Sequence, residues 1–410
     1  MINRGIEEGS DNMKLKKALL EGRKIIGVWG VGHVGYSCMS HFAEQGVQCI
    51  GFDVDRAKVE AINGGEMPVL NMDYWLGFAP DSLYRTGIAR ATNDWKELIQ
   101  PQIAVHFICI PTERMGEPFM GALMDVCEKL VTYKDDPPPE PPLIIIESTL
   151  VPGTIDREVL PFLENRGLKV GRDFLLGAAP RRDWFSSPDK SLKTLNRVYG
   201  GADAISTNTM KEVLSIVCEN LVEAPNHYYA ETVKSVENAY RHLGVVLAFE
   251  LSNAYPNVDV RTLLELVGTK WNMETYFPSL GVGGYCLPIA SRYVLQGAER
   301  PEELRLFEQT IRTGESQPAH VVQSLIKRGS KRVGILGLSY APNIKVHALS
   351  PAIKIAACFA EQGVNAKIHD PLYTPEEIKN LSGAETFTFP GDLNDFDTIV
   401  IVSGHREYRT

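Results

Sequence analysis

Cys286 stands near the end of a glycine-rich segment, Gly281-Val282-Gly283-Gly284-Tyr285-Cys286-Leu287-Pro288. Glycines let a backbone turn tightly and approach a ligand closely, and a cysteine beside such a turn can act as a nucleophile toward a carbonyl carbon. Free cysteines are more often buried structural residues, and this segment taken alone favours that alternative. Covalent catalysis by Cys286 therefore needs support from other parts of the chain.

Lys234 and Asn238 supply a second piece of possible chemistry. They lie in the stretch 229–255, where apolar residues recur at helical spacing, so their separation of four places both side chains on one helix face. A lysine held against a core can take part in proton transfer, and together with an amide it can polarise an oxyanion. A lysine exposed to solvent is the alternative, and the spacing alone favours it.

A glycine loop, Gly30-Val31-Gly32-His33-Val34-Gly35, predicts the site of a dinucleotide cofactor. An apolar run at 25–29 precedes the loop, a helical pattern follows it, and Asp53 ends the next apolar run. This order predicts a strand, a phosphate-binding turn at a helix N-terminus and an acid that accepts from a ribose hydroxyl. Asp53 would repel a 2′-phosphate and so favours NAD, although Arg56 and Lys58 leave NADP open unless they are solvated helix surface.

These residues are positioned by alternating elements. Between 25 and 147, short apolar runs alternate with helical patterns, which predicts a parallel sheet with crossover helices. The long helix predicted at 229–255 follows, and a second strand-to-glycine turn at 331–337 begins a smaller α/β unit. Its further predicted elements are a helix at 351–362 and strands at 364–369 and 397–402. The fold class is therefore α/β, with two doubly wound units around a helical middle.

Composition limits the partners and the compartment. The chain has 410 residues, seven cysteines and a net charge of -9, which gives no basic footprint for nucleic acid or an anionic membrane. The cysteines form no CxxC pair, which favours a reducing compartment, and we predict no metal site. There is no signal-peptide pattern and no apolar stretch of 18 residues. We therefore expect a cytoplasmic protein with a small-molecule substrate.

Six segments, taken in order, resemble the UDP-glucose/GDP-mannose dehydrogenase family. They are Gly30–Gly35 with Asp53, Ile110-Pro111-Thr112, Glu147–Thr154, Ala230–Asn238, Gly281–Pro288, and Gly337–Tyr340 followed by Ser350-Pro351-Ala352. The resemblance implies a Rossmann-type NAD domain, a central long-helix dimerisation region and a smaller Rossmann-like domain that binds the nucleotide sugar. The expected boundaries are 1–24 for an N-terminal extension, 25–222, 223–322 and 323–410. It also implies a homodimer.

The resemblance further implies an activity and its residues. Such enzymes oxidise a sugar CH₂OH to a carboxylate in two NAD-dependent steps, through a thiohemiacetal and a thioester on the cysteine. By position, Cys286 is the nucleophile, Lys234 and Asn238 stabilise the oxyanion, and Thr149 positions a water. The cofactor-binding residues are then Gly30, Gly32, His33, Val34, Gly35, Asp53, Lys58, Thr112 and Thr149. The substrate-binding residues are Gly283, Gly284 and Lys234, together with Arg181 and Arg182 for the reason given below.

Four positions depart from the family pattern. Ala290 stands where the family has an aspartate that assists proton transfer, and Arg181 stands where it has a glutamate. Ala341 and Ala348 replace basic residues that reach the nucleotide sugar. We hypothesise that Arg181 and its neighbour Arg182 instead grip an acidic group of a non-standard substrate, because arginine pairs with phosphate or carboxylate through two parallel bonds. The alternative is that both arginines are surface residues or bind backbone carbonyls.

Three functions remain open at this point. The first is the four-electron oxidation of a primary alcohol of a nucleotide sugar or related anionic substrate. The second is a dehydrogenase on the same scaffold that has changed substrate or stops after two electrons. The third is a non-catalytic NAD-binding protein, against which the joint presence of Cys286, Lys234 and Asn238 argues.

Overall fold

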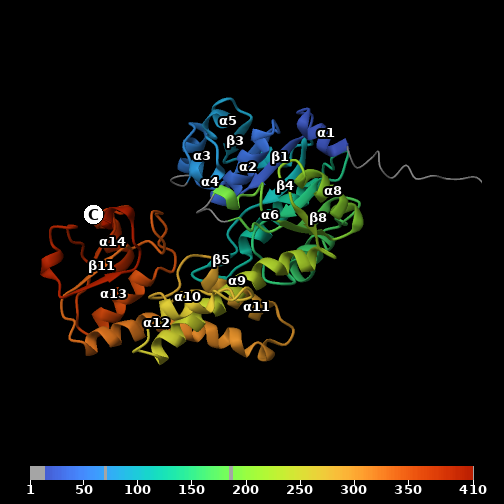
Figure 1. The fold of residues 1–410 in the computed structure, drawn as a ribbon. Helices are drawn as coiled ribbons and strands as arrows, with labels where there is room; N and C mark the ends of the chain where they lie inside the picture. Colours follow the sequence, from blue (N-terminus) through green and yellow to red (C-terminus); the bar gives the residue numbers. More distant parts are fainter. Residues whose placement is uncertain (1–13, 69–71, 184–187, 410) are drawn as a thin grey trace, which may run out of the picture. The chain divides into compact units, whose positions relative to one another are not determined.

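The computed structural model describes residues 14–68, 72–183 and 188–409 and divides into two compact units (Figure 1). The first unit contains Met1–Arg114 and Pro118–Ser235, and the second contains Met115–Glu117 and Val236–Thr410. The division falls inside the long helix α9, His227–Ala254. The central and C-terminal domains expected from the sequence therefore share one unit, apart from the residues before Val236.

An eight-stranded sheet forms the centre of the first unit, in the order β10-β9-β8-β7-β4-β1-β2-β3. Its strands are β1 Ile25–Trp29, β2 Cys49–Phe52, β3 Ala89–Thr92, β4 Ile103–Ile108, β7 Leu143–Ile146, β8 Leu175–Ala178, β9 Arg197–Gly201 and β10 Leu221–Glu223. All neighbours are parallel except β8 and β9. Every residue of β7 is buried, as expected of a strand covered on both faces. The predicted parallel sheet is confirmed.

Helices cover this sheet (Figure 1). They are α1 Lys14–Leu20, α2 His33–Glu44, α3 Arg56–Asn63, α4 Met72–Leu76, α5 Asp81–Arg85, α6 Gly121–Leu130, α7 Leu160–Glu164 and α8 Ala204–Leu214, with a π-helical turn at Ile155–Val159. Helix α1 lies within the predicted extension 1–24, of which residues 1–13 are outside the described part. It packs into the unit, because Leu19 is fully buried in the core and the Lys16 amide donates to Glu212 Oε1 at 2.8 Å.

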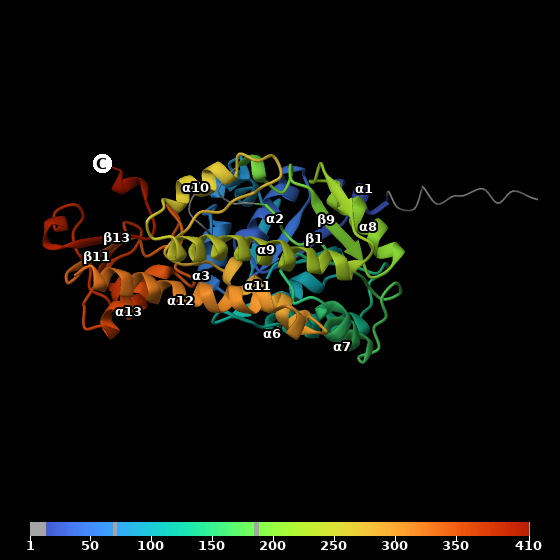
Figure 2. The ribbon, with the colours of Figure 1, turned by 60° about the horizontal axis from the view of Figure 1, so that its bottom comes forward.

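Figure 2 shows three helices side by side: α9, of which the part from Val236 onward belongs to the second unit, α11 (Leu287–Gly297) and α12 (Arg305–Lys327). Helix α10, Val260–Val267, begins where Asp259 accepts from the amides of Arg261 and Thr262, a typical N-cap. The remaining elements form a three-stranded parallel sheet, β12-β11-β13, with two helices. These are β11 Val333–Leu336, α13 Pro351–Glu361, β12 Lys367–His369, α14 Pro375–Ser382 and β13 Thr398–Ile401.

Local sequence accounts for several of these boundaries. Helix α13 begins at Pro351 because Ser350 caps it and proline suits the first helical position. A reciprocal capping box of Thr374 and Glu377 starts α14. The predicted strand at 364–369 is shorter in the structure, since β11 offers pairing partners only to Lys367–His369. Short 3₁₀ helices occur at Trp95–Ile99, Val131–Lys134, Pro188–Lys190, Pro301–Glu303, Leu393–Asp395 and Arg406–Tyr408.

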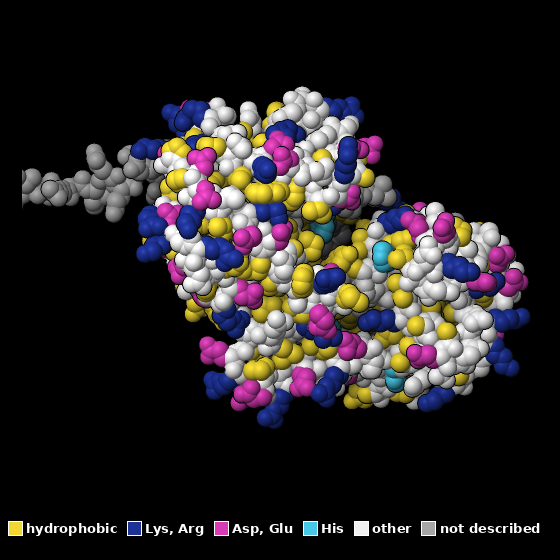
Figure 3. Space-filling model, turned by 180° about the vertical axis from the view of Figure 1, so that it is seen from behind, with side chains coloured by type: hydrophobic (Ala, Val, Ile, Leu, Met, Phe, Trp, Pro, Cys, Tyr) yellow, Lys and Arg dark blue, Asp and Glu magenta, His cyan; other side chains and the backbone are white. Residues whose placement is uncertain are grey.

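Two short strands, β5 Glu113–Arg114 and β6 Glu117–Pro118, pair as a small hairpin whose tip belongs to the second unit. No helix among the described residues is long and apolar enough to cross a membrane. On the face shown in Figure 3, Lys and Arg side chains are interspersed with Asp and Glu, in keeping with the modest negative net charge.

Candidate active site

The cofactor loop turns from β1 into α2. Gly30 has φ +85°, and a Cβ there would lie 2.6 Å from the Cys109 carbonyl oxygen. A Cβ on Gly35 would lie only 1.9 Å from the Gly30 carbonyl oxygen. Since real Cβ atoms do not approach oxygen so closely, both positions need glycine for the chain to make this turn.

Gly32 differs from those two glycines because it faces open space. It caps the N-terminus of α2, and a Cβ there would meet no atom within 4 Å. The first turn of α2, with His33 and Val34, presents backbone N–H groups and the positive end of the helix dipole at this position. The loop therefore fits the diphosphate of a dinucleotide, as the sequence predicts.

Asp53 follows β2 and holds the cofactor loop in place. Its Oδ2 accepts from the Val31 amide and from Lys58 Nζ, each at 3.0 Å, and its Oδ1 accepts from the Asp55 amide at 3.0 Å. Lys58 thus pairs with the acid, and its predicted contact with a cofactor phosphate stays a prediction. Arg56 is highly exposed and bonds Glu60 one turn along α3, which agrees with a solvated helix surface.

Thr112 and Thr149 lie together at the ends of β4 and β7. Thr112 Oγ1 donates to the Thr149 carbonyl oxygen at 2.5 Å. The loop that contains Thr149 is bonded in turn to α9, because Glu231 accepts from the amides of Gly153 at 2.5 Å and Ile155 at 3.2 Å. Ser235 Oγ also donates to the Leu150 carbonyl at 2.7 Å. Lys234 therefore stands on the turn of α9 that is fastened to the Thr149 loop.

Glu231 belongs to the segment Ala230–Asn238 but was not predicted as a site residue. Burial raises its pKa to about 8, while the two backbone amides oppose that shift. The sequence around Glu231 does not predict that it accepts hydrogen bonds from the Thr149 loop, because the two amides that donate to it lie more than 70 residues earlier in the chain. A glutamate on an otherwise helical, partly apolar face is the one local sign that it is buried.

Cys286 is exposed, whereas Cys38, Cys49, Cys109, Cys127 and Cys218 are buried and Cys358 is intermediate. The alternative of a buried structural cysteine at 286 is therefore wrong. Cys286 occupies the N-cap position of α11, where the helix dipole favours negative charge. The preceding Gly284 has φ +81° and donates its amide hydrogen to the Ala348 carbonyl at 2.8 Å. We call Gly281–Pro288 the cysteine loop.

Tyr340 lies beneath the cysteine loop and was not predicted as a site residue. A Cβ on Gly283 would lie 2.8 Å from Tyr340 Cβ, and one on Gly284 would lie 2.9 Å from the Tyr340 ring. Burial raises the pKa of Tyr340, and the nearby Cys286 and Tyr285 raise it further while Arg241 opposes them. The two glycines thus give the tyrosine ring room to support the loop close to the thiol.

The four predicted catalytic residues are distributed over both units. Thr149 and Lys234 belong to the first unit, and Asn238 and Cys286 belong to the second. Lys234 and Asn238 share helix α9, one turn apart, as predicted. Asn238 is almost fully buried.

Ala290 lies one turn after Cys286 on α11, at the position where the resemblance implies an aspartate. It is buried in an apolar cluster with Ala239 and Val294. Its surroundings are therefore those of a packing residue, and a proton acceptor would have to come from elsewhere.

Arg181 is buried, with only 5% of its side chain exposed. Its guanidinium donates to Asp183 at 2.8 and 2.5 Å, to Ser37 Oγ at 2.9 Å and to the Val34 carbonyl at 3.1 Å. Glu147 lies 3.5 Å away on the other side. These contacts tie the strand end to the first turns of α2. They do not support the hypothesis that Arg181 grips the substrate.

Arg182 and Glu147 complete this polar cluster. Arg182 Nη1 donates to the Asn196 carbonyl at 3.0 Å, so both arginines bind backbone carbonyls, as the alternative held. Glu147 accepts from the buried Arg197, which also donates to the Ala179 carbonyl. Burial opposes ionisation of Asp183, yet Arg181 holds the pKa of that carboxyl below its ordinary value. The cluster thus keeps its charges paired inside the first unit.

Family models match three stretches of the chain. Residues 24–217 match the NAD binding domain of the UDP-glucose/GDP-mannose dehydrogenase family, 228–315 match its central domain and 334–410 match its UDP binding domain. The cofactor loop, α9 and the cysteine loop, and the small parallel sheet fall in these three stretches in turn. The predicted order of the domains is confirmed.

Individual relatives agree with the models. The UDP-N-acetyl-D-mannosamine dehydrogenase of Pyrococcus horikoshii is 26% identical over 400 residues, which cover 94% of this chain and 90% of the relative. The GDP-mannose 6-dehydrogenase of Azotobacter vinelandii is 26% identical over a stretch that covers 84% of this chain and 80% of the relative.

Solved structures share the fold. The structure of the UDP-D-ManNAc dehydrogenase from Pyrococcus horikoshii aligns with a TM-score of 0.80 at 25% identity, covering 94% of this chain and 90% of that chain. A UDP-glucose dehydrogenase from Pyrobaculum islandicum aligns with a TM-score of 0.83 at 21% identity, covering 94% and 92%. The chain belongs to the UDP-glucose/GDP-mannose dehydrogenase family and is an NAD-dependent oxidoreductase.

Proposed function

We propose that this enzyme oxidises a primary alcohol of a nucleotide sugar to the carboxylate, with Cys286 as a covalent nucleophile. The observation that carries the proposal is the exposed thiol of Cys286 at the N-terminus of α11, on a glycine loop held by Tyr340. The curated relatives named above act on UDP- and GDP-linked sugars, and residues 334–410 match a UDP binding domain.

Two oxidations separate an alcohol from an acid. NAD, held by the cofactor loop and Asp53, would take up two electrons in each of them. After the first oxidation, Cys286 Sγ forms a bond to the aldehyde carbon and gives a thiohemiacetal. The second oxidation turns this adduct into a thioester, and water then cleaves the C–S bond to release the acid and the thiol. Two molecules of NADH form for each molecule of acid.

Lys234, Asn238 and Thr149 have supporting roles in this proposal. Lys234 and Asn238 donate hydrogen bonds to the oxygen that becomes negative when sulfur or water adds to the carbonyl. Thr149 positions the attacking water. The support is the shared face of α9 for the first two residues, and for Thr149 the fastening of its loop to α9 by Glu231 and Ser235.

The stoichiometry of the reaction tests the proposal. We would incubate the enzyme with a panel of UDP- and GDP-sugars and measure NADH and acid per sugar consumed. Two NADH and one acid are expected, and Cys286→Ser is expected to abolish acid formation. Cys358→Ser serves as the matched control, because Cys358 lies on α13 outside the cysteine loop. A Cys286→Ser enzyme that still forms acid would refute the covalent role.

A second candidate function follows from Ala290. Because this position lies in an apolar cluster, full oxidation loses a proton acceptor near the thiol, and the enzyme would stop after two electrons. One NADH and a released aldehyde, detected by trapping with a hydrazine, would then replace two NADH and an acid. The same assay therefore separates the two candidates.

We also propose that the enzyme is a homodimer. The second unit exposes large apolar side chains on α9, on α10 and after it, including Tyr240, Leu266 and Trp271, of which Trp271 is 93% exposed. Large apolar side chains left exposed on one unit are candidates for burial between two copies of the chain. Sedimentation of the wild type as a dimer and of Leu266→Glu as a monomer would support this face, whereas a monomeric wild type would exclude it.

A further inference from the structure

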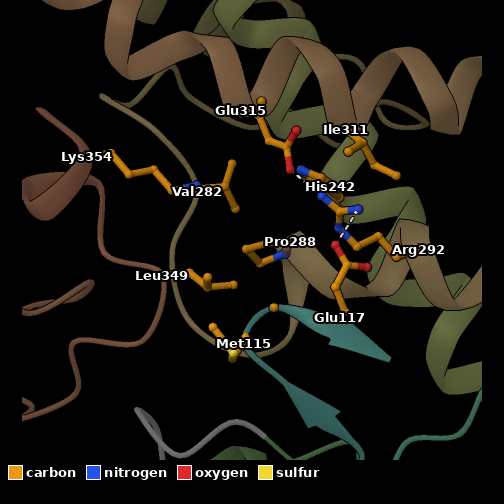
Figure 4. Close-up of a pocket in the computed structure, with 12 residues that line it drawn as sticks. Met115, Glu117, His242, Val282, Pro288, Arg292, Ile311, Glu315, Leu349 and Lys354 are labelled. Atoms are coloured by element: carbon orange, nitrogen blue, oxygen red, sulfur yellow. Dashed lines mark hydrogen bonds and ion pairs between the residues drawn. The ribbon is translucent and has the colours of Figure 1, made fainter. Parts of the chain in front are cut away.

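A cavity of about 240 Å³ lies within the second unit (Figure 4). Its walls come from the tip of the β5–β6 hairpin, α9, α11, α12, the loop before α13 and α13 itself. Val282 and Pro288, near the two ends of the cysteine loop, are among its lining residues, and Cys286 is not. The Cys286 side chain therefore does not form part of the cavity wall.

The volume of the cavity limits the size of the ligand that it can hold. A cavity of ~150 Å³ holds a benzene molecule, and pockets for drug-sized ligands run to about 300–1,000 Å³. The cavity in the second unit falls between these, so it suits a molecule the size of one sugar ring. A whole nucleotide sugar would not fit in it.

His242 supplies a buried polar atom on one side. Only 3% of the residue is exposed, and its Nδ1 lies 3.0 Å from Ser291 Oγ. The second ring nitrogen, Nε2, has no hydrogen bond among the described contacts, and a Cβ on Gly314 would lie 3.2 Å from it. Burial, together with the charge of Arg292, lowers the pKa of His242 to about 4. The neutral ring thus offers one hydrogen bond where Gly314 leaves room.

Three charged side chains lie beside His242 in Figure 4. Arg292 Nη1 is 3.0 Å from Glu117 Oε1, and Arg292 Nη2 bonds Glu315 Oε1. Both carboxylates line the cavity and keep acceptor positions beyond their bond to the arginine. Together with the imidazole, they suit a ligand that carries several hydroxyl groups.

The opposite side of the cavity carries a cation. Lys354 of α13 enters the view across from Arg292, beside Val282 (Figure 4). It is partly exposed, and it forms no ion pair or hydrogen bond among the described contacts. The apolar side chains of Val282, Pro288 and Leu349 lie between the two polar sides. Lys354 is therefore placed to receive an anionic group of a ligand whose hydroxyls lie toward His242.

We propose that this cavity binds a small hydroxylated carboxylate, the size of a sugar acid, with its carboxylate at Lys354 and its hydroxyls at His242, Glu117 and Glu315. Ligand binding in this cavity is a function additional to the oxidation proposed for Cys286 and does not depend on that oxidation. None of the polar residues of the cavity has a role in the proposed reaction.

Calorimetric titration of the full chain with three probes tests the ligand chemistry. Glucuronate carries both a carboxylate and hydroxyls, glucose lacks the carboxylate, and hexanoate lacks the hydroxyls. Glucuronate is expected to bind one per chain, and the other two at least about tenfold more weakly, since each loses one polar side of the site.

Two variants locate the binding. Lys354→Gln removes the cation, and Lys379→Gln on the exposed surface of α14 is its matched control. Gly314→Ala places a methyl group against His242 Nε2, within a helix that alanine favours over glycine. Lys354→Gln and Gly314→Ala are each expected to weaken glucuronate binding about tenfold, with a melting temperature that is unchanged or, for Gly314→Ala, raised.

Several results would overturn the proposal. They are no glucuronate binding, equal binding of glucose or hexanoate, and an affinity for glucuronate that either Lys354→Gln or Gly314→Ala leaves unchanged. A loss of binding in the Lys379→Gln control that matches the loss in Lys354→Gln would do the same, because it would place the carboxylate elsewhere.

Discussion

The molecule contains two glycine loops, and they are stabilised in opposite ways. The cofactor loop is closed by neighbours in its own domain: Gly35 lies against the Gly30 carbonyl, and Asp53 accepts from the Val31 amide. The cysteine loop is closed by a distant segment, since Gly283 and Gly284 lie against Tyr340 and the Gly284 amide bonds Ala348. The first loop is closed by residues of the sheet that contains its own strand, and the second is closed by the later segment that contains Tyr340 and Ala348.

A short sequence motif therefore predicts the conformation of the cofactor loop, whereas no local motif predicts that of the cysteine loop. In the cofactor loop, Gly30 and Gly35 are required by the fold, whereas Gly32 faces open space. In the cysteine loop, Gly283 and Gly284 leave space for Tyr340, and Gly281 lies against Pro351, so the partners of all three glycines come from a later part of the chain. A substitution at Gly35 should therefore disturb stability, and one at Tyr340 should disturb catalysis.

Gly35→Ala should have the largest effect. The added Cβ would lie 1.9 Å from the Gly30 carbonyl oxygen, so the loop or α2 must move. We expect a loss of roughly 3–5 kcal/mol in the free energy of unfolding, in the range of severe backbone clashes. Urea unfolding followed by circular dichroism measures it. An unfolding midpoint equal to that of the wild type would show that the loop is not closed as described.

Gly32→Ala sharpens the contrast within the same loop. Because a Cβ at Gly32 meets no protein atom within 4 Å, the free energy of unfolding should change by less than about 0.5 kcal/mol. The methyl group would instead occupy the space predicted for the cofactor diphosphate, and we expect the KM for NAD to rise about tenfold. Steady-state kinetics together with a thermal melt separate the two effects. An unchanged KM for NAD would mean that the cofactor diphosphate does not bind next to Gly32.

Tyr340→Ala tests the cysteine loop. Without the ring that lies against Gly284, the cysteine loop loses a support close to the thiol. We expect kcat for NADH formation to fall about tenfold or more, because small misplacements of reacting groups cost catalysis heavily. The affinity for NAD should not change. Tyr340→Phe is the control that keeps the ring, and it should retain most of the activity. Equal losses in both variants would shift the role from the ring to the hydroxyl.

The smallest predicted effect concerns buried histidines in both units. Burial lowers the pKa of His106 in the first unit to about 3, and burial with Arg292 lowers that of His242 in the second to about 4. Both values lie below the ordinary 6.5, so their contribution to stability is complete above pH 6.5 and is lost as the pH falls toward 4 and 3.

Linkage gives the size of this effect. Each histidine should reduce the free energy of unfolding by about 0.7 kcal/mol between pH 7 and pH 6. His242→Gln should remove the part of this pH-dependent loss that comes from His242. Urea unfolding of the variant and the wild type at pH 7 and pH 6 would measure the difference. Identical pH dependence in the variant and the wild type would mean that His242 is not buried as a neutral ring.

The sequence was sufficient for features whose parts lie close together in the chain. The cofactor loop, Asp53 and α9 are examples, because a strand, a turn and a helix in succession determine their geometry. Glu231, Tyr340 and the cavity around His242 were not found, since their partners, such as Gly153 for Glu231 and Gly283 for Tyr340, come from elements that do not follow one another directly in the chain. Arg181 shows the same limit, because its charge suggested a ligand, whereas a buried ion pair with Asp183 and a bond to Ser37 occupy it.

The hydrogen bond from the Gly284 amide to residue 348 uses a backbone carbonyl. Any side chain at position 348 leaves that acceptor in place, so a substitution there keeps the bond that holds the segment containing Cys286. The side chain at position 348 is therefore free to vary while the backbone that holds the cysteine loop keeps its hydrogen bond.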